Sequence, residues 1–226
     1  MTEINIARTE NKYLLDKVSS YRVKRNLKAV LPVDRPGAAG GYMVRSLYFD
    51  TIYDKDYYDK LNGLDNRQKI RLRIYNPEDT TAKLEVKEKQ GSYQWKRSIT
   101  ISRQDAMLLI QGRYDELIDK YSSLFMRTVL RKMQIEVYIP KIIIEFNRLA
   151  FINETNNIRI TFDTELKSTE ASFNLYSSKL NLKPIIYPVI LEVKYNNFLL
   201  SYIKSALNLA NQVPTSTSKY CLGRQL

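Results

Sequence analysis

In the segment RQKIRLRIY, residues 67–75, cationic and aliphatic side chains alternate without interruption from Lys69 to Ile74. In an extended chain successive side chains point to opposite faces, so three aliphatic residues share one face and three cations share the other. The aliphatic set is Ile70, Leu72 and Ile74, and the cationic set is Lys69, Arg71 and Arg73. This stretch therefore predicts a β-strand with one apolar face and one cationic face.

The residues that follow repeat the pattern. Residues 81–89 place Leu84 and Val86 on one face and Glu85 on the other, between Lys83 and Lys87. Gly91 predicts a turn, and residues 93–101 are expected to return as a neighbouring strand. Short connections of this kind favour an antiparallel sheet over a parallel one.

Other segments predict further strands and several helices. Strands are expected over residues 42–50, 134–151 with a break at Pro140, 158–164 and 188–195. Helices are expected over residues 18–31, 54–61, 114–133 and 198–209, and a fifth opens at Ser102 in a capping-box arrangement and stops at Gly112. The chain of 226 residues is predicted to form a single α+β domain over residues 1–226.

Two structures explain the charged faces of these strands. An antiparallel sheet can leave its polar face in water, and charged residues there would be solvated. Alternatively, the sheet closes into a barrel with a polar, cationic interior. Like charges along one face repel each other unless an anion lies between them. Single acidic residues on separate strands, Glu85, Asp163 and Glu192, suit a divalent cation bound together with phosphates.

The composition limits the chemistry. A formal net charge of +12 and a pI of about 9.6 predict an anionic partner, such as a nucleic acid, a phosphorylated metabolite or an anionic lipid. The absence of histidine excludes Ser-His, Cys-His and His-metal mechanisms, and leaves oxygen ligands for magnesium or manganese. Cys221 is the only cysteine, so no internal disulfide forms.

The same sequence argues against several other classes. The seven glycines match neither a P-loop nor a dinucleotide-binding fingerprint. The seventeen tyrosines do not form an exposed aromatic and cationic pattern, which disfavours nucleic acid. The uncharged run 184–191 is too short to span a bilayer, and residues 1–10 lack the apolar region of a signal peptide, so a cytoplasmic protein is expected.

Eight short motifs occur in an order that resembles the VTC domain, the polyphosphate polymerase branch of the triphosphate tunnel metalloenzymes (the CYTH-like superfamily). The resemblance runs from about Arg8 to Tyr220. The motifs are Arg8-x-Glu10-x-Lys12-Tyr13, Ser46-Leu-Tyr-Phe-Asp50-Thr51, Lys69-Ile-Arg71-Leu-Arg73, Leu84-Glu85-Val-Lys87, Arg148-x-Ala150-Phe151, Arg159-Ile-Thr-x-Asp163, Leu191-Glu192-Val-Lys194 and Ser218-Lys219-Tyr220.

The resemblance implies a closed eight-stranded antiparallel β-barrel with flanking helices, whose tunnel is lined by lysine and arginine. It implies transfer of the γ-phosphate of ATP onto a growing polyphosphate chain, with Mn²⁺ or Mg²⁺ as cofactor. Glu192 matches the metal-binding glutamate. The residues expected at the transferring phosphates are Arg71, Arg73, Lys87, Arg159 and Lys219, and those expected to bind other phosphates are Lys12, Lys69, Lys96, Arg148, Lys194 and Ser218.

One departure separates the branches of the superfamily. The hydrolase branch opens with Glu-x-Glu-x-Lys, whereas this chain has Arg8 at the first position. Loss of that carboxylate suits the polymerase branch. A triphosphatase with water as acceptor, and a non-catalytic module that binds polyphosphate or RNA, remain as alternatives. ATP and polyphosphate are the expected ligands, and a membrane partner protein is compatible with the sequence.

Overall fold

The structure is a computed structural model that describes residues 8–35, 40–91, 93–185, 189–209 and 212–225. The chain forms two compact units, each built from separate stretches of sequence. The first unit contains residues Met1–Met43, Glu145–Lys167 and Pro184–Ser218. The second unit contains residues Val44–Ile144, Ser168–Lys183 and Lys219–Leu226.

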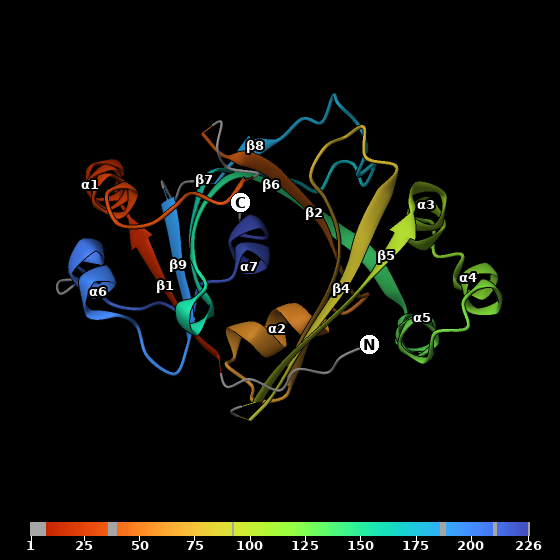
Figure 1. Ribbon diagram of the computed structural model, residues 1–226. Coiled ribbons are helices and arrows are strands. Elements are labelled where there is room, and N and C mark those ends of the chain that lie inside the picture. Colours follow the sequence, from red (N-terminus) through yellow and green to blue (C-terminus); the bar gives the residue numbers. More distant parts are fainter. Residues whose placement is uncertain (1–7, 36–39, 92, 186–188, 210–211, 226) are drawn as a thin grey trace. The chain divides into compact units, whose positions relative to one another are not determined.

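The second unit is a sheet with helices on its apolar face. Its strands follow the order β6-β2-β3-β4-β5, where β6 is shared between the units. The helices α3, α4 and α5 lie beside β4 and β5 (Figure 1). The element bounds are β2 Tyr42–Thr51, α2 Lys55–Leu61, β3 Arg67–Ile74, β4 Thr81–Gln90, β5 Tyr93–Ser102, α3 Arg103–Ile110, α4 Tyr114–Lys120, α5 Leu124–Ile135, β6 Tyr138–Asn153 and α7 Lys219–Gly223.

The predicted alternation of β3 and β4 explains this packing. Ile70, Leu72 and Leu84 are fully buried in a cluster that also contains Met126 and Leu130 of α5. A leucine side chain in such a core contributes about 2 kcal/mol or more to folding. The opposite face of the same strands is therefore free to carry charge.

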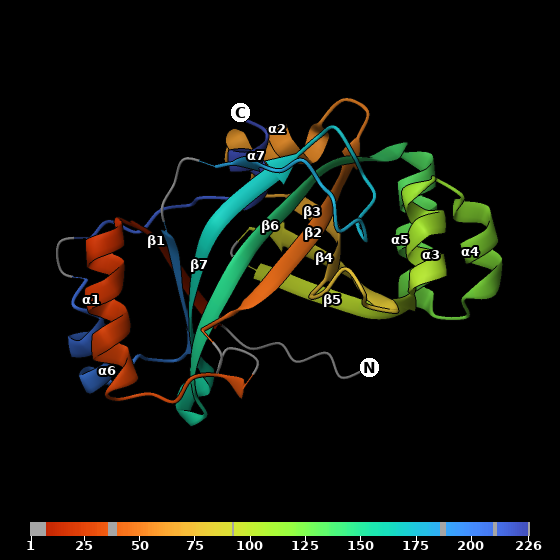
Figure 2. The ribbon, with the colours of Figure 1, turned by 90° about the horizontal axis from the view of Figure 1, so that it is seen from above.

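In the first unit, β1 pairs with β9, a strand that lies far from it in the sequence. Its strands follow the order β1-β9-β7-β6, and the short β8 pairs with β7. The helices α1 and α6 lie side by side on this sheet (Figures 1 and 2) and cover a second apolar cluster that includes Leu27, Phe162 and Ile203. The element bounds are β1 Arg8–Leu15, α1 Lys17–Lys28, η2 Thr155–Asn157, β7 Ile158–Thr169, β8 Lys183–Pro184, β9 Val189–Asn196 and α6 Ser201–Leu207.

The expected closure into a barrel is not observed. The strand order ends at β1 and at β5, and no ladder between described residues joins these two edges. The outer edge of β1 is instead contacted by the chain near its C-terminus, where the amide of Thr215 donates to the carbonyl oxygen of Lys12 at 2.8 Å. The structure therefore shows an antiparallel α+β fold with an open strand order.

Several predicted boundaries need correction. Pro140 does not interrupt β6, because it lies at the start of the strand, where a missing N–H is tolerated. Helix 114–133 is two helices, α4 and α5, separated at residues 121–123. The helix predicted over residues 198–209 is α6, which begins at Ser201 and ends at Leu207. None of the described helices is long and apolar enough to cross a membrane.

Candidate functional site

The motif Ser46-Leu-Tyr-Phe-Asp50 lies on β2 and presents three polar side chains to one face. Leu47 and Phe49 point to the apolar core. Ser46 and Tyr48 pair in register with Arg73 and Arg71 of β3. The period-two spacing of the motif therefore brings these side chains to the two arginines that the sequence predicts as phosphate ligands.

Glu85 is the centre of a cationic cluster on the second unit. Its carboxylate is buried and accepts from Nε of Arg71 at 2.7 Å. The guanidinium of Arg73 lies 3.5 Å away, and the ammonium of Lys96 also contacts it. The hydroxyl of Tyr48 accepts from Nη1 of Arg71 at 2.9 Å. Three cations thus share one buried carboxylate, so the cluster keeps an excess of positive charge.

The excess of positive charge around Glu85 shifts the pKa values of Glu85, Lys96 and Tyr48. Burial would raise the pKa of Glu85, but Arg71, Arg73 and Lys96 outweigh it and hold the pKa well below its usual range. Burial lowers the pKa of Lys96, an effect that Glu85 opposes and the two arginines reinforce. Burial would likewise raise the pKa of Tyr48, whereas Arg71, Arg73 and Lys219 together lower it. The positive potential of the cluster is therefore strong enough to favour an anion.

A row of lysines crosses the same three strands. Lys69 of β3 pairs in register with Lys87 of β4, and Lys87 pairs with Lys96 of β5. Like charges directly opposite each other on neighbouring strands are destabilising. A bound polyanion would lessen this repulsion.

Asp50 attaches the C-terminal helix α7 to β2 and α2. The carboxylate of Asp50 is fully buried and accepts from the backbone amides of Thr51, Asp56 and Tyr57. It also accepts from the hydroxyl of Tyr220 at 2.6 Å. The ring of Tyr220 stacks on Tyr48, with centroids 5.2 Å apart. These contacts fix α7, which begins at Lys219, close to the cationic cluster of the second unit.

Replacing Tyr220 by phenylalanine is expected to destabilise the protein by about 1.5–3 kcal/mol, because it removes a hydrogen bond to a buried carboxylate. The measurement is the free energy of unfolding in denaturant. The matched control is Tyr202→Phe. The hydroxyl of Tyr202 accepts a hydrogen bond from the side-chain amide of Asn153 at the surface. Equal stabilities of the two variants would contradict this account of α7.

The first unit carries four alternating charges on two paired strands. Glu10 pairs in register with Lys194, and Lys12 pairs with Glu192. The ammonium of Lys12 lies 3.2 Å from Glu10 and 3.8 Å from Glu192, and that of Lys194 lies 3.6 Å and 3.1 Å from the same carboxylates. Lys12 also donates to the carbonyl oxygen of Thr217 at 3.3 Å. The strand register therefore brings two carboxylates to one small area.

Arginines complete this charged face. Arg148 of β6 binds Asp163 of β7 through two hydrogen bonds of 2.6 and 2.7 Å, and its guanidinium lies 3.9 Å from Glu192. Burial would lower the pKa of Arg148, but Asp163 raises it. Arg159 pairs with Asp34 at 2.8 Å and donates to the hydroxyl of Tyr42. These carboxylates hold both guanidiniums in fixed orientations.

The same face offers a set of hard oxygen donors. Thr161 lies opposite Glu192 in the β7–β9 register, and its buried hydroxyl has no hydrogen-bond partner among the described residues. Among the described residues, no three acidic or cysteine side chains lie close enough together to hold a metal ion by themselves. Glu10, Glu192 and the Thr161 hydroxyl fit a divalent cation that takes its remaining ligands from phosphate and water, as magnesium commonly does.

The two clusters differ in their charge balance. The cluster of the first unit sets Lys12, Lys194 and Arg148 against three carboxylates, those of Glu10, Glu192 and Asp163. Among the described residues, the cluster of the second unit sets three cations around the carboxylate of Glu85. The first composition suits a metal ion, and the second suits phosphate oxygens.

Every residue predicted for the site can now be placed. Arg71, Arg73, Lys69, Lys87, Lys96 and Lys219 lie in the second unit, and Lys12, Arg148, Arg159, Glu192, Lys194 and buried Ser218 lie in the first. The side chains of Glu85, Arg73 and Glu192 are at most 8% exposed, so a solvated sheet face is the wrong interpretation for them. Glu85 and Glu192 are each held by three cations, so ion pairing alone does not distinguish a metal ligand between them.

Sequence reasoning missed some members of both clusters. Tyr48 and Asp50 were inside a recognised motif, but their partners come from α2, β3 and α7, which periodicity does not reveal. Glu10 stands two residues before Lys12, and this spacing was the available signal for a second carboxylate beside Glu192. The orphaned hydroxyl of Thr161 has no sequence signal, because a threonine in a strand is ordinary.

Comparisons with known proteins agree on the fold. A putative adenylate cyclase from Bacillus halodurans is 16% identical with a TM-score of 0.54, and 94% of each chain is covered. A putative adenylyl cyclase from Hippeastrum, HpAC1, described as having a dominant triphosphatase activity, is 12% identical with a TM-score of 0.59; 98% of this chain and 96% of that chain are covered. No sequence among the curated proteins matches the chain. The family model of the VTC domain matches residues 7–226. The chain therefore belongs to the VTC domain family.

Proposed function

We propose that this protein is a metal-dependent polyphosphate polymerase that transfers the γ-phosphate of ATP onto inorganic polyphosphate. The observation that carries the proposal is the cluster of Arg71, Arg73 and Lys96 around the single carboxylate of Glu85. Phosphoryl transfer depends mainly on positioning and on neutralising the charge of the phosphates. An excess of fixed cations on a rigid sheet supplies both. Membership of the VTC family supports the same substrate class.

Arginine is suited to holding the reacting phosphates. Arg71 uses two of its five N–H donors for Glu85 and Tyr48 among the described residues, which leaves donors for phosphate oxygens. Glu85 and Tyr48 fix the plane of the guanidinium, so a phosphate meets a preorganised partner. Arg73, Lys69, Lys87 and Lys219 would neutralise neighbouring phosphates.

The metal is assigned to the first unit. Glu192, with Glu10 beside it, would hold Mn²⁺ or Mg²⁺, and the bound ion would neutralise phosphate charge. Arg148, fixed by Asp163, would then bind phosphate next to Glu192. The acceptor is a terminal phosphate oxygen that is already ionised near neutral pH. Such a nucleophile needs no strong general base, in keeping with a chain that has no histidine.

A triphosphatase is the second candidate. It would use the same cations with water as the acceptor, and the similarity in fold to HpAC1, described as having a dominant triphosphatase activity, favours including it. A binding module without turnover is the third. The polymerase is preferred because the first position of the Glu-x-Glu-x-Lys motif is Arg8, which removes one carboxylate from the hydrolase pattern.

Product analysis distinguishes the three. Purified protein is incubated with ATP and Mn²⁺, the mixture is run on a gel stained for polyphosphate, and free phosphate is assayed in parallel. A ladder accompanied by ADP is the expected result. Free phosphate without a ladder would establish the triphosphatase, and tight polyphosphate binding without turnover would establish the binding module.

The metal assignment has its own test. Glu192→Gln is expected to raise the Mn²⁺ concentration needed for half-maximal turnover by about 10-fold or more, because one anionic ligand is lost. Glu154→Gln, at an exposed position next to η2, is the control and should leave the metal requirement unchanged. An unchanged requirement in Glu192→Gln would place the metal elsewhere.

A further inference from the structure

The outer face of helix α1 carries cations and apolar side chains together. One side of α1 is buried through Ser20, Val23 and Leu27 and packs on the first unit. At about 100° per residue, the exposed residues fall on the opposite side as one continuous stripe. In this stripe Val18 is 60% and Tyr21 is 68% exposed. The cations around these two residues are Lys17, Arg22, Arg25 and Lys28.

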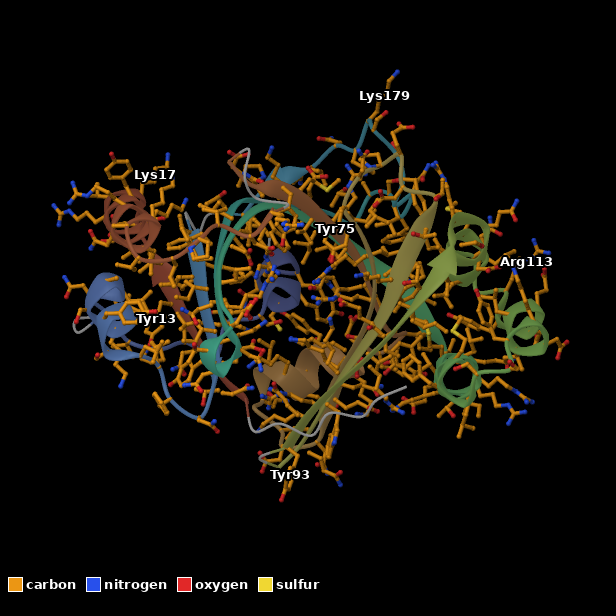
Figure 3. The ribbon with its side chains drawn as sticks, viewed as in Figure 1. Tyr13, Lys17, Tyr75, Tyr93, Arg113 and Lys179 are labelled. Carbon is orange, nitrogen blue, oxygen red and sulfur yellow. The ribbon has the colours of Figure 1, made fainter. Side chains whose placement is uncertain are left out.

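No carboxylate of the described residues forms an ion pair with this stripe. Within the described part of the chain, none of its four cations forms an ion pair or a side-chain hydrogen bond. The neighbouring helix α6 adds Lys204, and neither helix contains an aspartate or glutamate. Asp16, which precedes α1, is occupied by Ser19, whose amide and hydroxyl donate to it at 2.8 and 2.6 Å. Lys17 projects from the helix, away from the sheet (Figure 3).

We propose that this stripe of α1 docks the protein on an anionic membrane surface. Clusters of four or more basic residues on a helix bind anionic lipid headgroups, and exposed tyrosine is favoured at the interface between headgroups and acyl chains. A polyphosphate chain matches the charge equally well, but it has no apolar group to cover Val18 and Tyr21. The combination of the two side-chain types therefore favours lipid. None of the residues of this stripe belongs to either charged cluster, so the proposal does not depend on the proposed function.

The test is sedimentation of the full-length protein with vesicles. Wild-type protein should bind vesicles of equimolar phosphatidylcholine and phosphatidylserine, and not vesicles of phosphatidylcholine alone. Each basic residue near an anionic surface strengthens binding by about five-fold. The variant Lys17→Glu/Arg22→Glu/Arg25→Glu/Lys28→Glu should therefore weaken binding by at least about 100-fold. Val18→Ser/Tyr21→Ser should weaken it by about 10-fold without changing the net charge.

A matched variant distinguishes an effect of the α1 face on vesicle binding from an effect of the protein's net charge. Arg127→Glu/Arg131→Glu/Lys179→Glu/Lys183→Glu reverses four exposed cations of the second unit, of which Lys179 projects into solvent (Figure 3). It should lower vesicle binding only a few-fold. Circular dichroism melts and ATP turnover without vesicles check that both variants fold and remain active.

Three results would overturn the proposal. Wild-type protein could fail to prefer the anionic vesicles. The two charge-reversal variants could lose binding equally, which would show an effect of net charge. The α1 variant could keep its vesicle binding and lose binding to polyphosphate, which would identify an anionic polymer as the partner of this face.

Discussion

Replacement of Arg71 by lysine is expected to lower kcat/KM for ATP by about 100- to 1,000-fold, the usual loss when one preorganised donor to a transition state is removed. The guanidinium binds Glu85 through Nε and Tyr48 through Nη1, and its remaining N–H groups are fixed in one plane. A lysine ammonium can approach Glu85, but it cannot contact Tyr48 and two phosphate oxygens with defined geometry. The loss arises although the charge is retained. The measurement is the rate of ADP release with Mn²⁺ at several ATP concentrations.

Arg45→Lys provides the matched control. Arg45 is also a buried arginine of the second unit, and its guanidinium donates to the carbonyl oxygens of Leu175 and Ser177. Its replacement should reduce stability and leave kcat/KM within a few-fold of the wild type. If Arg71→Lys retained full metal-dependent turnover, the cluster around Glu85 would not be the catalytic one. Equal losses in both variants would indicate a general effect of disturbing a buried arginine.

The second large effect concerns stability and pH. Asp56 is fully buried, and burial together with the neighbouring Asp50 raises its pKa to about 8. The hydroxyl of Tyr138 contacts both of its carboxylate oxygens at 3.1–3.2 Å, and Lys55 and Lys132 are the nearby cations. A carboxyl group whose native pKa is raised binds its proton more tightly in the folded state.

The sign of the pH dependence follows from this shift. The stabilising contribution of protonated Asp56 is complete below about pH 4, near the pKa of an unfolded aspartate, and is lost as the pH rises through about 8. Over that range the free energy of unfolding should fall by on the order of 5 kcal/mol from this group alone. Asp56→Asn keeps the shape of the protonated side chain and cannot ionise. The variant should therefore be the more stable protein at pH 8 to 9.

Denaturant unfolding at a series of pH values measures this contribution as the difference between variant and wild type. Asp65→Asn is the control, because the Asp65 carboxylate is 78% exposed and its removal should not change the slope. Parallel curves for the wild type and Asp56→Asn would show that Asp56 is ionised in the native protein across the range.

Periodicity predicted the strands whose two faces differ. In β3 and β4 the apolar residues enter the core and the charged residues form the cluster around Glu85, as the alternation indicates. It did not predict β1, because Glu10 and Lys12 face the charges of β9, and Thr9 and Asn11 on its other face are polar too. Tyr13 and Leu15 on that face do pack in the apolar cluster of the first unit, but two residues are too few to show a hydrophobic period.

Sequence motifs supply the candidate residues of the site, which stay predictions, but they do not supply the pairings between those residues. Family motifs identified Arg71, Arg148 and Glu192, yet which carboxylate holds which arginine depends on strand register between distant segments. Nothing in the local sequence shows that Asp163 binds Arg148 across β6 and β7. Nor does it show that Glu85 binds Arg71 across β3 and β4. Such pairings are fixed only when the sheet assembles.

The pairing of β1 with β9 has a consequence for how the protein is made. The register joins residues 8–15 to residues 189–196, and the Thr215 amide then contacts Lys12. A ribosome therefore exposes β1 long before its partner strand exists. Most of the second unit, residues 44–144, is one uninterrupted stretch and can collapse early. The first unit must wait until residues 184–218 have been synthesised, and the high sequence separation of its contacts slows that step. Truncation near the C-terminus should therefore leave an exposed, unpaired N-terminal strand, a known starting point for aggregation.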